Sequence, residues 1–332
     1  MDLSKKPIAF VTGGTGFIGS HLVERLLAQG YSVRCLVRNP QKLGYLKNLP
    51  IDIFEGDLFS TYALEKGIEG ADYVFHVAGV VAAKGKEEFY RYNRDGTKNV
   101  VETTARVNPK IKKFVFVSSQ TAVGPGTGKN PVNENIAPHP ITTYGKSKLA
   151  AEQQVMLFKD VIPVTILRVA AVYGQRDTAT FDYFKSAHMG LELLIGFHDT
   201  YVSLVHCKDI VYGLILAAES EKSCGQIYFL GSEKYYSWDE IGYITKNVMN
   251  KKLLRIRVPK PLVFVIGGIS QLVSRFKAKP SVLNFEKAYD LVQDNWCCDI
   301  TKAKDELGYK PEITLEEGIR ETVKWYLDNK WM

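Results

Sequence analysis

The chain has 332 residues, of which 45% are hydrophobic and 24% are charged, and its formal net charge is +7. This composition is that of a soluble, enzyme-sized globular protein with a full core in one large or two coupled domains. The lysines are scattered singly rather than gathered in runs, so the charge does not indicate a nucleic acid partner and would equally suit a dinucleotide or another small anion.

Apolar strand-like runs alternate with helical patterns through the first half of the chain. The strand-like runs are 8–14, 31–37, 51–57, 71–79, 113–119 and 164–174, and the helical patterns are 20–29, 88–107 and the segment around residue 144 onward. The run from Phe114 to Val117 is apolar throughout, as a strand covered on both faces must be. The alternation predicts an α/β fold of the Rossmann type, with a doubly wound parallel sheet between helices.

The alternation becomes less regular after Gly174, where a loop and then a helix are expected up to Gly190. Strand and helix patterns return over 201–220 and 225–231. We therefore expect a smaller, discontinuous C-terminal substrate domain beside the Rossmann domain. The predicted domains are 1–176 plus about 201–232 for the cofactor, and about 177–200 plus 233–332 for the substrate.

Glycines recur at every third position directly after the first predicted strand. Gly13, Gly16 and Gly19 stand in "VTGGTGFIGSHLV", between that strand and the first helix. Missing side chains there allow a tight turn, close approach of the backbone to a pyrophosphate and close helix packing, while the helix N-terminus points at the anion. With the next strand at 31–37, this context predicts a dinucleotide site rather than a purely structural turn.

The end of the second predicted strand bears on which dinucleotide binds. A carboxylate there would accept hydrogen bonds from the ribose of NAD, but the chain reads Val37, Arg38, Asn39. Arg38 either pairs with the 2′-phosphate of NADP or is a solvated surface arginine. We expect NADP, with NAD as the alternative. Asp57, at the end of the third strand, either meets the adenine rim or caps a helix.

The cysteines and the N-terminal sequence bear on the compartment. Cys35, Cys207, Cys224, Cys297 and Cys298 show no metal-ligand spacing, and their odd number does not suggest a disulfide framework. The first residues contain no apolar core long enough for a signal peptide. We expect a cytoplasmic protein without a metal site.

A tyrosine and a lysine stand one helical turn apart in "PITTYGKSKLAAEQQV". Tyr144 and Lys148 therefore share a face of the predicted helix. Taken alone, the pair fits a half-buried core tyrosine and a solvated lysine.

Several motifs together resemble the extended short-chain dehydrogenase/reductase family. They are "TGGTGFIG", "DL" at 57–58, "HVAG" at 76–79, "NRDGTKNV", "VSSQTAVG", "YGKSK" and "LRVAAVYG". The tail from Trp296 onward resembles the family's closing segment, so the resemblance covers nearly the whole chain. It implies an NAD(P)-dependent enzyme that acts on CH–OH groups and forms a homodimer through the helices near 88–107 and 144–158.

The resemblance also implies three catalytic residues, Ser119, Tyr144 and Lys148. Tyr144 is the acid and base, and an ammonium group one turn away would lower the pKa of its phenol. Lys148 also binds the nicotinamide ribose in this family. Ser119 donates to the substrate oxygen, where negative charge develops, whereas Ser118 bonds locally.

Cofactor contacts are implied along the carboxyl ends of the strands. His76 lines the cofactor without a role in proton transfer, and Asn93 fixes backbone near the active site. The implied cofactor residues are Gly13, Thr15, Gly16, Phe17, Ile18, Gly19, Arg38, Asp57, Leu58, Val77, Ala78, Gly79, Val117, Tyr144, Lys148 and Val169.

Departures from the family's subgroups indicate the reaction. Sugar-nucleotide dehydratases place an acidic pair directly after the catalytic hydroxyl residue, where this chain has Gln120 and Thr121. Epimerases and dehydratases commonly bind the nucleotide diphosphate with an asparagine and an arginine, and the corresponding stretches 169–172 and 201–206 contain neither. These departures favour a reductase, with a nucleotide-sugar epimerase or dehydratase as the alternative. A non-enzymatic NADP sensor would be expected to lack the tyrosine and the lysine.

The stretch "CLVRNP" resembles the dihydroflavonol reductase and 3β-hydroxysteroid dehydrogenase-like branch, whose substrates are apolar ketones or secondary alcohols. We therefore expect NADP(H)-dependent reduction of a ketone, or the reverse oxidation, on an apolar small molecule. One apolar set in the second domain either lines the pocket for this ligand or forms that domain's core. It comprises Phe181, Tyr183, Phe184, Met189, Leu193 and Leu194.

An apolar stretch from Leu262 to Val273 lies between basic residues within 251–279. It is too short to span a bilayer. An apolar helix with basic flanks can lie on an anionic membrane surface. A buried helix or a flap over an apolar ligand is the commoner arrangement.

Overall fold

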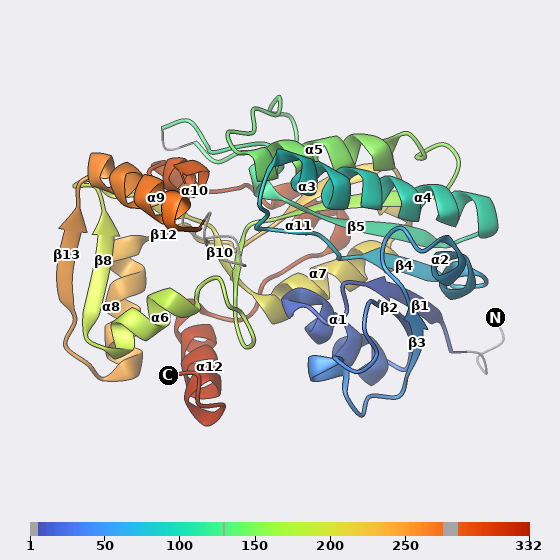
Figure 1. The fold of residues 1–332 in the computed structure, drawn as a ribbon, viewed down its shortest axis with the longest axis horizontal. Helices are drawn as coiled ribbons and strands as arrows, with labels where there is room; N and C mark the ends of the chain where they lie inside the picture. Colours follow the sequence, from blue (N-terminus) through green and yellow to red (C-terminus); the bar gives the residue numbers. More distant parts are fainter. Residues whose placement is uncertain (1–5, 129, 275–284) are drawn as a thin grey trace.

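A parallel sheet forms the centre of the computed structural model, which describes residues 6–128, 130–274 and 285–332 (Figure 1). Within these residues the sheet has seven strands in the order β11-β6-β5-β4-β1-β2-β3. The strands are β1 (Ile8–Thr12), β2 (Ser32–Val37), β3 (Ile51–Glu55), β4 (Tyr73–His76), β5 (Lys113–Ser119), β6 (Val164–Val169) and β11 (Gln226–Leu230). The predicted doubly wound α/β fold is confirmed.

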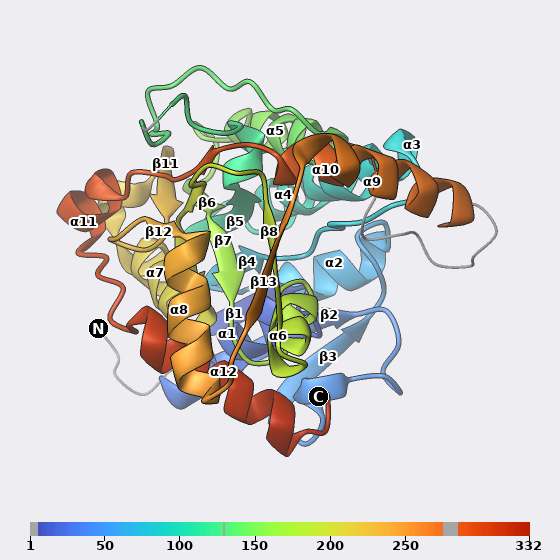
Figure 2. The same ribbon diagram turned by 90° about the vertical axis from the view of Figure 1, so that its left-hand side faces the viewer.

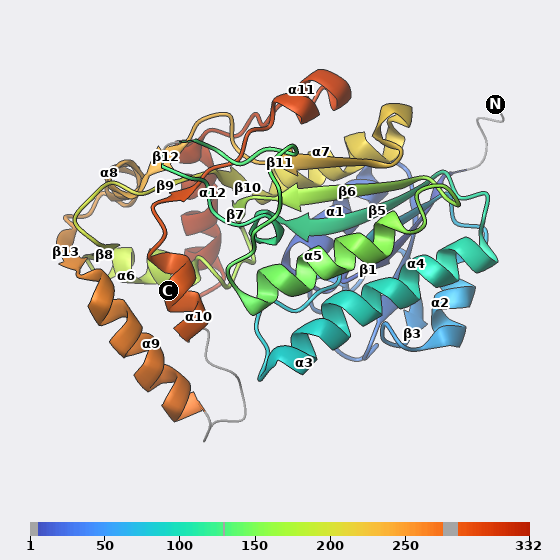
Figure 3. The same ribbon diagram turned by 90° about the horizontal axis from the view of Figure 1, so that it is seen from above.

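Helices cover both faces of this sheet (Figures 1 and 3). Helices α1 (Phe17–Ala28) and α7 (Cys207–Glu219) lie on one face, and α2 (Thr61–Ile68), α4 (Gly96–Val107) and α5 (Thr143–Met156) lie on the other. Along β5, Val115 and Val117 join the first core, whereas Phe114 and Phe116 join the second. Burial on both sides explains why the strand is apolar throughout.

The helix predicted near 88–107 is a continuous segment with a wider turn inside it. Helix α3 (Lys86–Phe89) continues through a π-helical turn, Tyr90–Asp95, into α4. Such turns often occur at functional sites. This turn carries the buried Asn93.

The remaining elements gather at one end of the sheet, which faces the viewer in Figure 2. In this region β7 pairs with β10, β8 pairs with β13, and β9 lies between β12 and β14. The strands are β7 (Ala171–Tyr173), β8 (Leu191–Ile195), β9 (Tyr201–Val202), β10 (Leu204–His206), β12 (Tyr236–Ser237), β13 (Leu254–Val258) and β14 (Asn295–Trp296). The helices are α6 (Phe181–His188), α8 (Trp238–Met249), α9 (Lys260–Ser274), α10 (Phe285–Leu291), α11 (Thr301–Leu307) and α12 (Leu315–Asp328).

The C-terminal part of the chain returns to the large sheet. Helix α11 lies against β11, where Lys302 Nζ donates to Gln226 Oε1 (2.9 Å) and to the Ile227 carbonyl (3.1 Å). The division into two domains stays a prediction.

The structure corrects the expectation for the apolar stretch after Leu262. It forms α9, which is buried on one side at Val263 but exposes Leu262, Val265, Ile266 and Ile269 on the other, so it is not a fully buried helix. The flap and the membrane contact stay predictions. No helix among the described residues has the length and hydropathy needed to cross a membrane. The basic residues expected after this helix, Arg275, Lys277 and Lys279, lie outside the described residues.

Candidate active site

The start of α5 is fixed against the end of β5 by a cap and a close backbone contact. Thr142 caps the helix, since its Oγ1 accepts a hydrogen bond from the Gly145 amide (3.1 Å). A Cβ atom on Gly145 would lie 2.3 Å from the Thr121 carbonyl oxygen. Only glycine therefore lets α5 approach this closely, and the approach sets Tyr144 beside Ser119.

Ser119 is oriented by Thr121, which follows it in the 3₁₀ turn Gln120–Ala122. The Thr121 amide (3.2 Å) and Thr121 Oγ1 (2.9 Å) both donate to Ser119 Oγ. A hydroxyl has two acceptor sites and one donor, so the Ser119 proton is left for another partner. Sequence reasoning missed this role of Thr121, because it depends on the geometry of the turn.

The Tyr144 phenol is the partner of this serine. Burial raises the pKa of Tyr144 to about 12, and the carboxylate of Asp290 adds to the rise, whereas the hydrogen bond with Ser119 opposes it. Stabilising the phenolate lowers the pKa of a phenol. With its pKa raised in this way, the Tyr144 phenol is protonated at neutral pH.

Lys148 is buried rather than solvated. Its Nζ donates to the Val117 carbonyl on β5 (2.7 Å) and lies 4.2 Å from the centroid of the Phe116 ring. Burial lowers the pKa of Lys148 to about 7, and the Glu152 carboxylate one turn along α5 opposes that fall. The alternative of a solvated lysine at this position is therefore wrong.

Glu152 belongs to a buried network behind the site. It pairs with Arg168 of β6, with Oε2 2.7 Å from Arg168 Nη2, and accepts a hydrogen bond from Ser118 Oγ (2.5 Å). The hydroxyl of Ser118 is therefore engaged on the side of β5 away from Ser119, though with a distant residue rather than locally as predicted.

Asn93 ties the π-helical turn to α5. Its Nδ2 donates to Ser147 Oγ (2.9 Å) and to the Val80 carbonyl (3.0 Å), and its Oδ1 accepts from the Val80 amide (2.8 Å). Asn93 thus fixes backbone near the site, which matches its predicted role.

The glycine turn fits the pyrophosphate of a dinucleotide. Gly13 has a φ of +76°, and a Cβ there would lie 2.6 Å from the Ala78 amide nitrogen. A Cβ on Gly19 would lie 2.1 Å from the Gly13 carbonyl oxygen. Helix α1 follows Gly16 without any side-chain cap, so the amides at its N-terminus, from Phe17 and Ile18, are oriented for an anion.

The other predicted cofactor residues lie at the carboxyl ends of neighbouring strands. Thr15 stands in the glycine turn, Val77, Ala78 and Gly79 follow β4, and Val169 pairs with Ser119 between β6 and β5. In an open parallel sheet this edge is where ligands bind.

Arg38 follows β2 as an exposed side chain, and among the described residues no hydrogen bond or ion pair is recorded for it. Asp57 is engaged at the start of α2, where its Oδ1 accepts from the Phe59 amide (2.9 Å) and from Ser60 Oγ (3.0 Å). These bonds form a turn before α2, whose N-cap is Ser60, so neither the capping role nor the adenine contact of Asp57 is shown. Leu58 is buried beneath Gly96.

His76 is a satisfied core residue. Its Nδ1 is 2.7 Å from Thr12 Oγ1, its Nε2 is 2.9 Å from Thr97 Oγ1, and burial lowers its pKa to about 3. A neutral, fully bonded imidazole accords with the absence of a proton-transfer role.

The apolar set expected in the second domain does not line one pocket. Phe181, Tyr183 and Phe184 pack in a core with Tyr326, and Leu194 is also buried. Met189 and Leu193 are instead exposed on the outside of the molecule. Phe181, Tyr183 and Phe184 therefore follow the core alternative, whereas Leu194 lines a small cleft with Trp238 and Arg257.

A family model described as the NAD dependent epimerase/dehydratase family matches residues 9–231, about two thirds of the chain. The chain belongs to this family. The resemblance found in its motifs is thereby confirmed, and with it an NAD(P)-dependent enzyme that acts on CH–OH groups.

Similar proteins span the whole chain. Ceramide reductase of Caulobacter vibrioides is 28% identical over 333 residues, which cover 100% of this chain and 98% of that protein. The 3 beta-hydroxysteroid dehydrogenase/Delta 5→4-isomerase of Mycobacterium tuberculosis is 26% identical, with 96% of this chain and 90% of that protein covered. The crystal structure of UDP-glucose 4-epimerase from Thermotoga maritima has a TM-score of 0.78 at 24% identity and covers 97% of this chain and 99% of that one. At 24% identity, the similarity to this epimerase structure establishes a shared fold and not a shared activity.

Proposed function

We propose that this protein is an NADP(H)-dependent oxidoreductase that reduces a ketone, or oxidises a secondary alcohol, on an apolar small molecule. The observation that carries the proposal is the position of Ser119, whose Oγ accepts two hydrogen bonds from Thr121 and which lies within hydrogen-bond reach of the Tyr144 phenol. A substrate carbonyl placed between these two hydroxyls would receive a hydrogen bond from each.

The residues then divide the work of a carbonyl reduction. Tyr144 gives its proton to the carbonyl oxygen, and Ser119 stabilises the negative charge that develops on that oxygen. The positive charge of Lys148 stabilises the phenolate left behind. The nicotinamide, when bound, supplies the hydride to the carbonyl carbon, so that a ketone, NADPH and a proton give a secondary alcohol and NADP⁺.

Arg38 supports NADP rather than NAD. Its exposed guanidinium follows β2, and β2 ends at Val37 without a carboxylate to accept hydrogen bonds from the ribose. Asp57, the acidic residue expected at the adenine rim, has one oxygen engaged by Phe59 and Ser60. A 2′-phosphate would make charge-assisted hydrogen bonds with the arginine.

The names of the similar proteins support an apolar substrate. Ceramide reductase and 3 beta-hydroxysteroid dehydrogenase are named for lipids. The lack of an asparagine in 169–172 and of an arginine in 201–206 supports the same substrate class over a nucleotide sugar.

The cofactor proposal is tested by fluorescence titration with NADPH and NADH on the wild type, Arg38→Ala and the control Arg320→Ala, which changes an exposed arginine on α12. Hydrogen bonds to charged groups contribute about 1.5–3 kcal/mol, so Arg38→Ala should weaken NADPH about tenfold to a hundredfold and leave NADH unchanged. A wild-type preference for NADH would refute the role of Arg38 and favour the epimerase alternative.

The chemistry is tested by screening apolar ketones with NADPH against the wild type and Tyr144→Phe. We expect turnover of at least one ketone, with the variant losing turnover but keeping NADPH affinity. Equal turnover by the two proteins would refute the role of Tyr144.

We also propose that the protein forms a homodimer. Helices α4 and α5 lie side by side on one face of the sheet, as a four-helix bundle with a second subunit would require (Figure 3). Sedimentation equilibrium on the full chain tests this expectation.

A further inference from the structure

The ribbon formed by β8 and β13 turns an apolar face to solvent. Leu191 and Leu193 of β8 stand opposite Leu254 and Ile256 of β13, and all four side chains are exposed. We call these four residues the ribbon face. A two-stranded ribbon normally buries its apolar side against the core, so this orientation calls for a partner.

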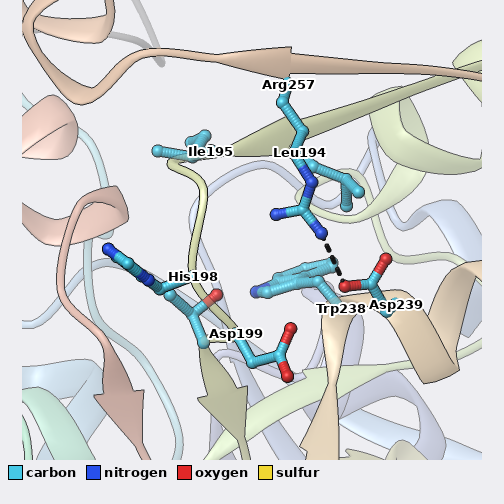
Figure 4. Close-up of a pocket in the computed structure, with 8 residues that line it drawn as sticks. Leu194, Ile195, His198, Asp199, Trp238, Asp239 and Arg257 are labelled. Carbon is cyan, nitrogen blue, oxygen red and sulfur yellow. Dashed lines mark hydrogen bonds and ion pairs between the residues drawn. The ribbon is translucent and has the colours of Figure 1, made fainter.

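The charged residues of the same ribbon face inward. Glu192 is buried and forms an ion pair with the part-exposed Arg255, whose Nε lies 2.6 Å from Glu192 Oε2. Arg257 reaches from β13 to Asp239 of α8 (2.8 Å), beside Trp238 in the small cleft under the ribbon (Figure 4). These ion pairs fix the orientation of the ribbon. The exposure of its leucines is therefore not due to a poorly anchored strand.

Helix α9 continues the apolar surface. Its exposed residues Leu262, Val265, Ile266 and Ile269 follow the spacing i, i+3, i+4, i+7 and therefore form one stripe along the helix. Val263, between them, is buried against α10. We call the four exposed residues the α9 stripe.

The sequence around these surfaces is basic. The described residues between Glu240 and Glu286 include six lysines and arginines and no acidic residue. Three of the six form ion pairs with acidic residues from other parts of the chain, namely Arg255, Arg257 and Lys260. Lys246 and Lys252 are exposed, and among the described residues neither has a recorded ion pair. A second copy of the same surface would bring like charges together, whereas an anionic lipid surface would attract them.

Helix α10 links this surface to the active site. Phe285 and Tyr289 of α10 contact the Phe264 ring of α9, with centroids 5.3 and 6.2 Å apart. Glu286 of α10 accepts hydrogen bonds from the amide (3.0 Å) and Oγ1 (2.6 Å) of Thr143. Thr143 directly precedes the proposed acid and base, so α10 contacts both the helix with the apolar stripe and the start of the helix that carries the reacting groups.

We propose that the ribbon face and the α9 stripe dock on an anionic lipid bilayer, and that a lipid ketone reaches Tyr144 along α10. The docking follows from the exposed apolar residues and the basic sequence, whereas the delivery of a ketone rests on the proposed function. An apolar helix beside basic residues binds such a surface through buried apolar area and electrostatic attraction.

The test is co-sedimentation of the full chain with vesicles of phosphatidylglycerol and with vesicles of phosphatidylcholine. Variants Ile269→Asp and Leu193→Asp change exposed positions, and Val161→Asp is the matched control, because Val161 is 58% exposed like Ile269 but precedes β6 at the opposite edge of the sheet. We expect preference for phosphatidylglycerol, and about a tenfold or greater loss of binding in the first two variants alone. Added salt should weaken the binding.

Absence of binding to phosphatidylglycerol vesicles, or an equal loss in Val161→Asp, would overturn the docking. So would sedimentation equilibrium in which Ile269→Asp dissociates a dimer while the wild type ignores lipid, because the stripe would then contact a second copy. NADPH titration of every variant keeps the two proposals separate. Lipid binding without NADPH binding would refute the proposed function and leave the docking intact.

Discussion

Replacing Glu152 with glutamine should lower the free energy of unfolding by about 3–5 kcal/mol, because it breaks a buried ion pair from one side. Three contacts join the two side chains: Arg168 Nη2 to Glu152 Oε2 at 2.7 Å, and Arg168 Nε to the two carboxylate oxygens at 3.1 and 3.2 Å. The side chains are only 4% and 3% exposed, so the guanidinium left behind has no access to water. Urea denaturation of the wild type and the variant measures the loss.

An exposed ion pair provides the control. Arg106 and Glu65 are 2.8 Å apart, nearly the same distance, but their side chains are 56% and 33% exposed. Glu65→Gln should therefore cost less than about 1 kcal/mol. Equal losses in Glu152→Gln and Glu65→Gln would refute the reasoning from burial. A double variant, Glu152→Leu with Arg168→Met, should recover most of the stability, because it leaves no unpaired charge.

Two further predictions concern α5. A Cβ on Gly145 would lie 2.3 Å from the Thr121 carbonyl oxygen, whereas ordinary contacts begin at 3.4 Å. Gly145→Ala should therefore shift the helix start by about 1 Å and reduce turnover about a hundredfold. The control Lys146→Ala, at an exposed position of the same helix, should leave turnover unchanged. Equal turnover in the two variants would contradict the close-packing argument. Burial lowers the pKa of Lys148 from 10.5 to about 7, so between these values the unfolded state binds more protons and stability rises with pH. Unfolding free energies across this range should rise more steeply in the wild type than in Lys148→Met, and parallel curves would count against a buried lysine.

The large sheet could be predicted from the sequence because its strands are buried on both faces. Runs such as Phe114 to Val117 are apolar at every position, and this pattern distinguishes a central strand from an edge strand. The β8–β13 ribbon could not be predicted in this way. "LELLI" and "LRIRV" mix apolar and charged positions, but such a pattern does not tell which side faces water, and here the charged side faces inward.

The candidate site was only partly visible in the sequence. The spacing of Tyr144 and Lys148 placed them on one face of a helix, but the burial of the lysine depends on its bond with the Val117 carbonyl across two elements. The orienting contact of Thr121 depends on the 3₁₀ turn. Contacts of this kind arise from tertiary packing, so no local pattern records them.

Ser118 and Ser119 point to opposite sides of β5, one toward Glu152 and the other toward the site. This division follows from the pleat, in which neighbouring side chains alternate. Inserting or deleting one residue in β5 would exchange the two serines, because a shift of one position moves every side chain to the other face. Changes of length in the loops and the outlying ribbon would not cause this exchange. Changes of length there would leave Ser119 at the proposed site and Ser118 beside Glu152.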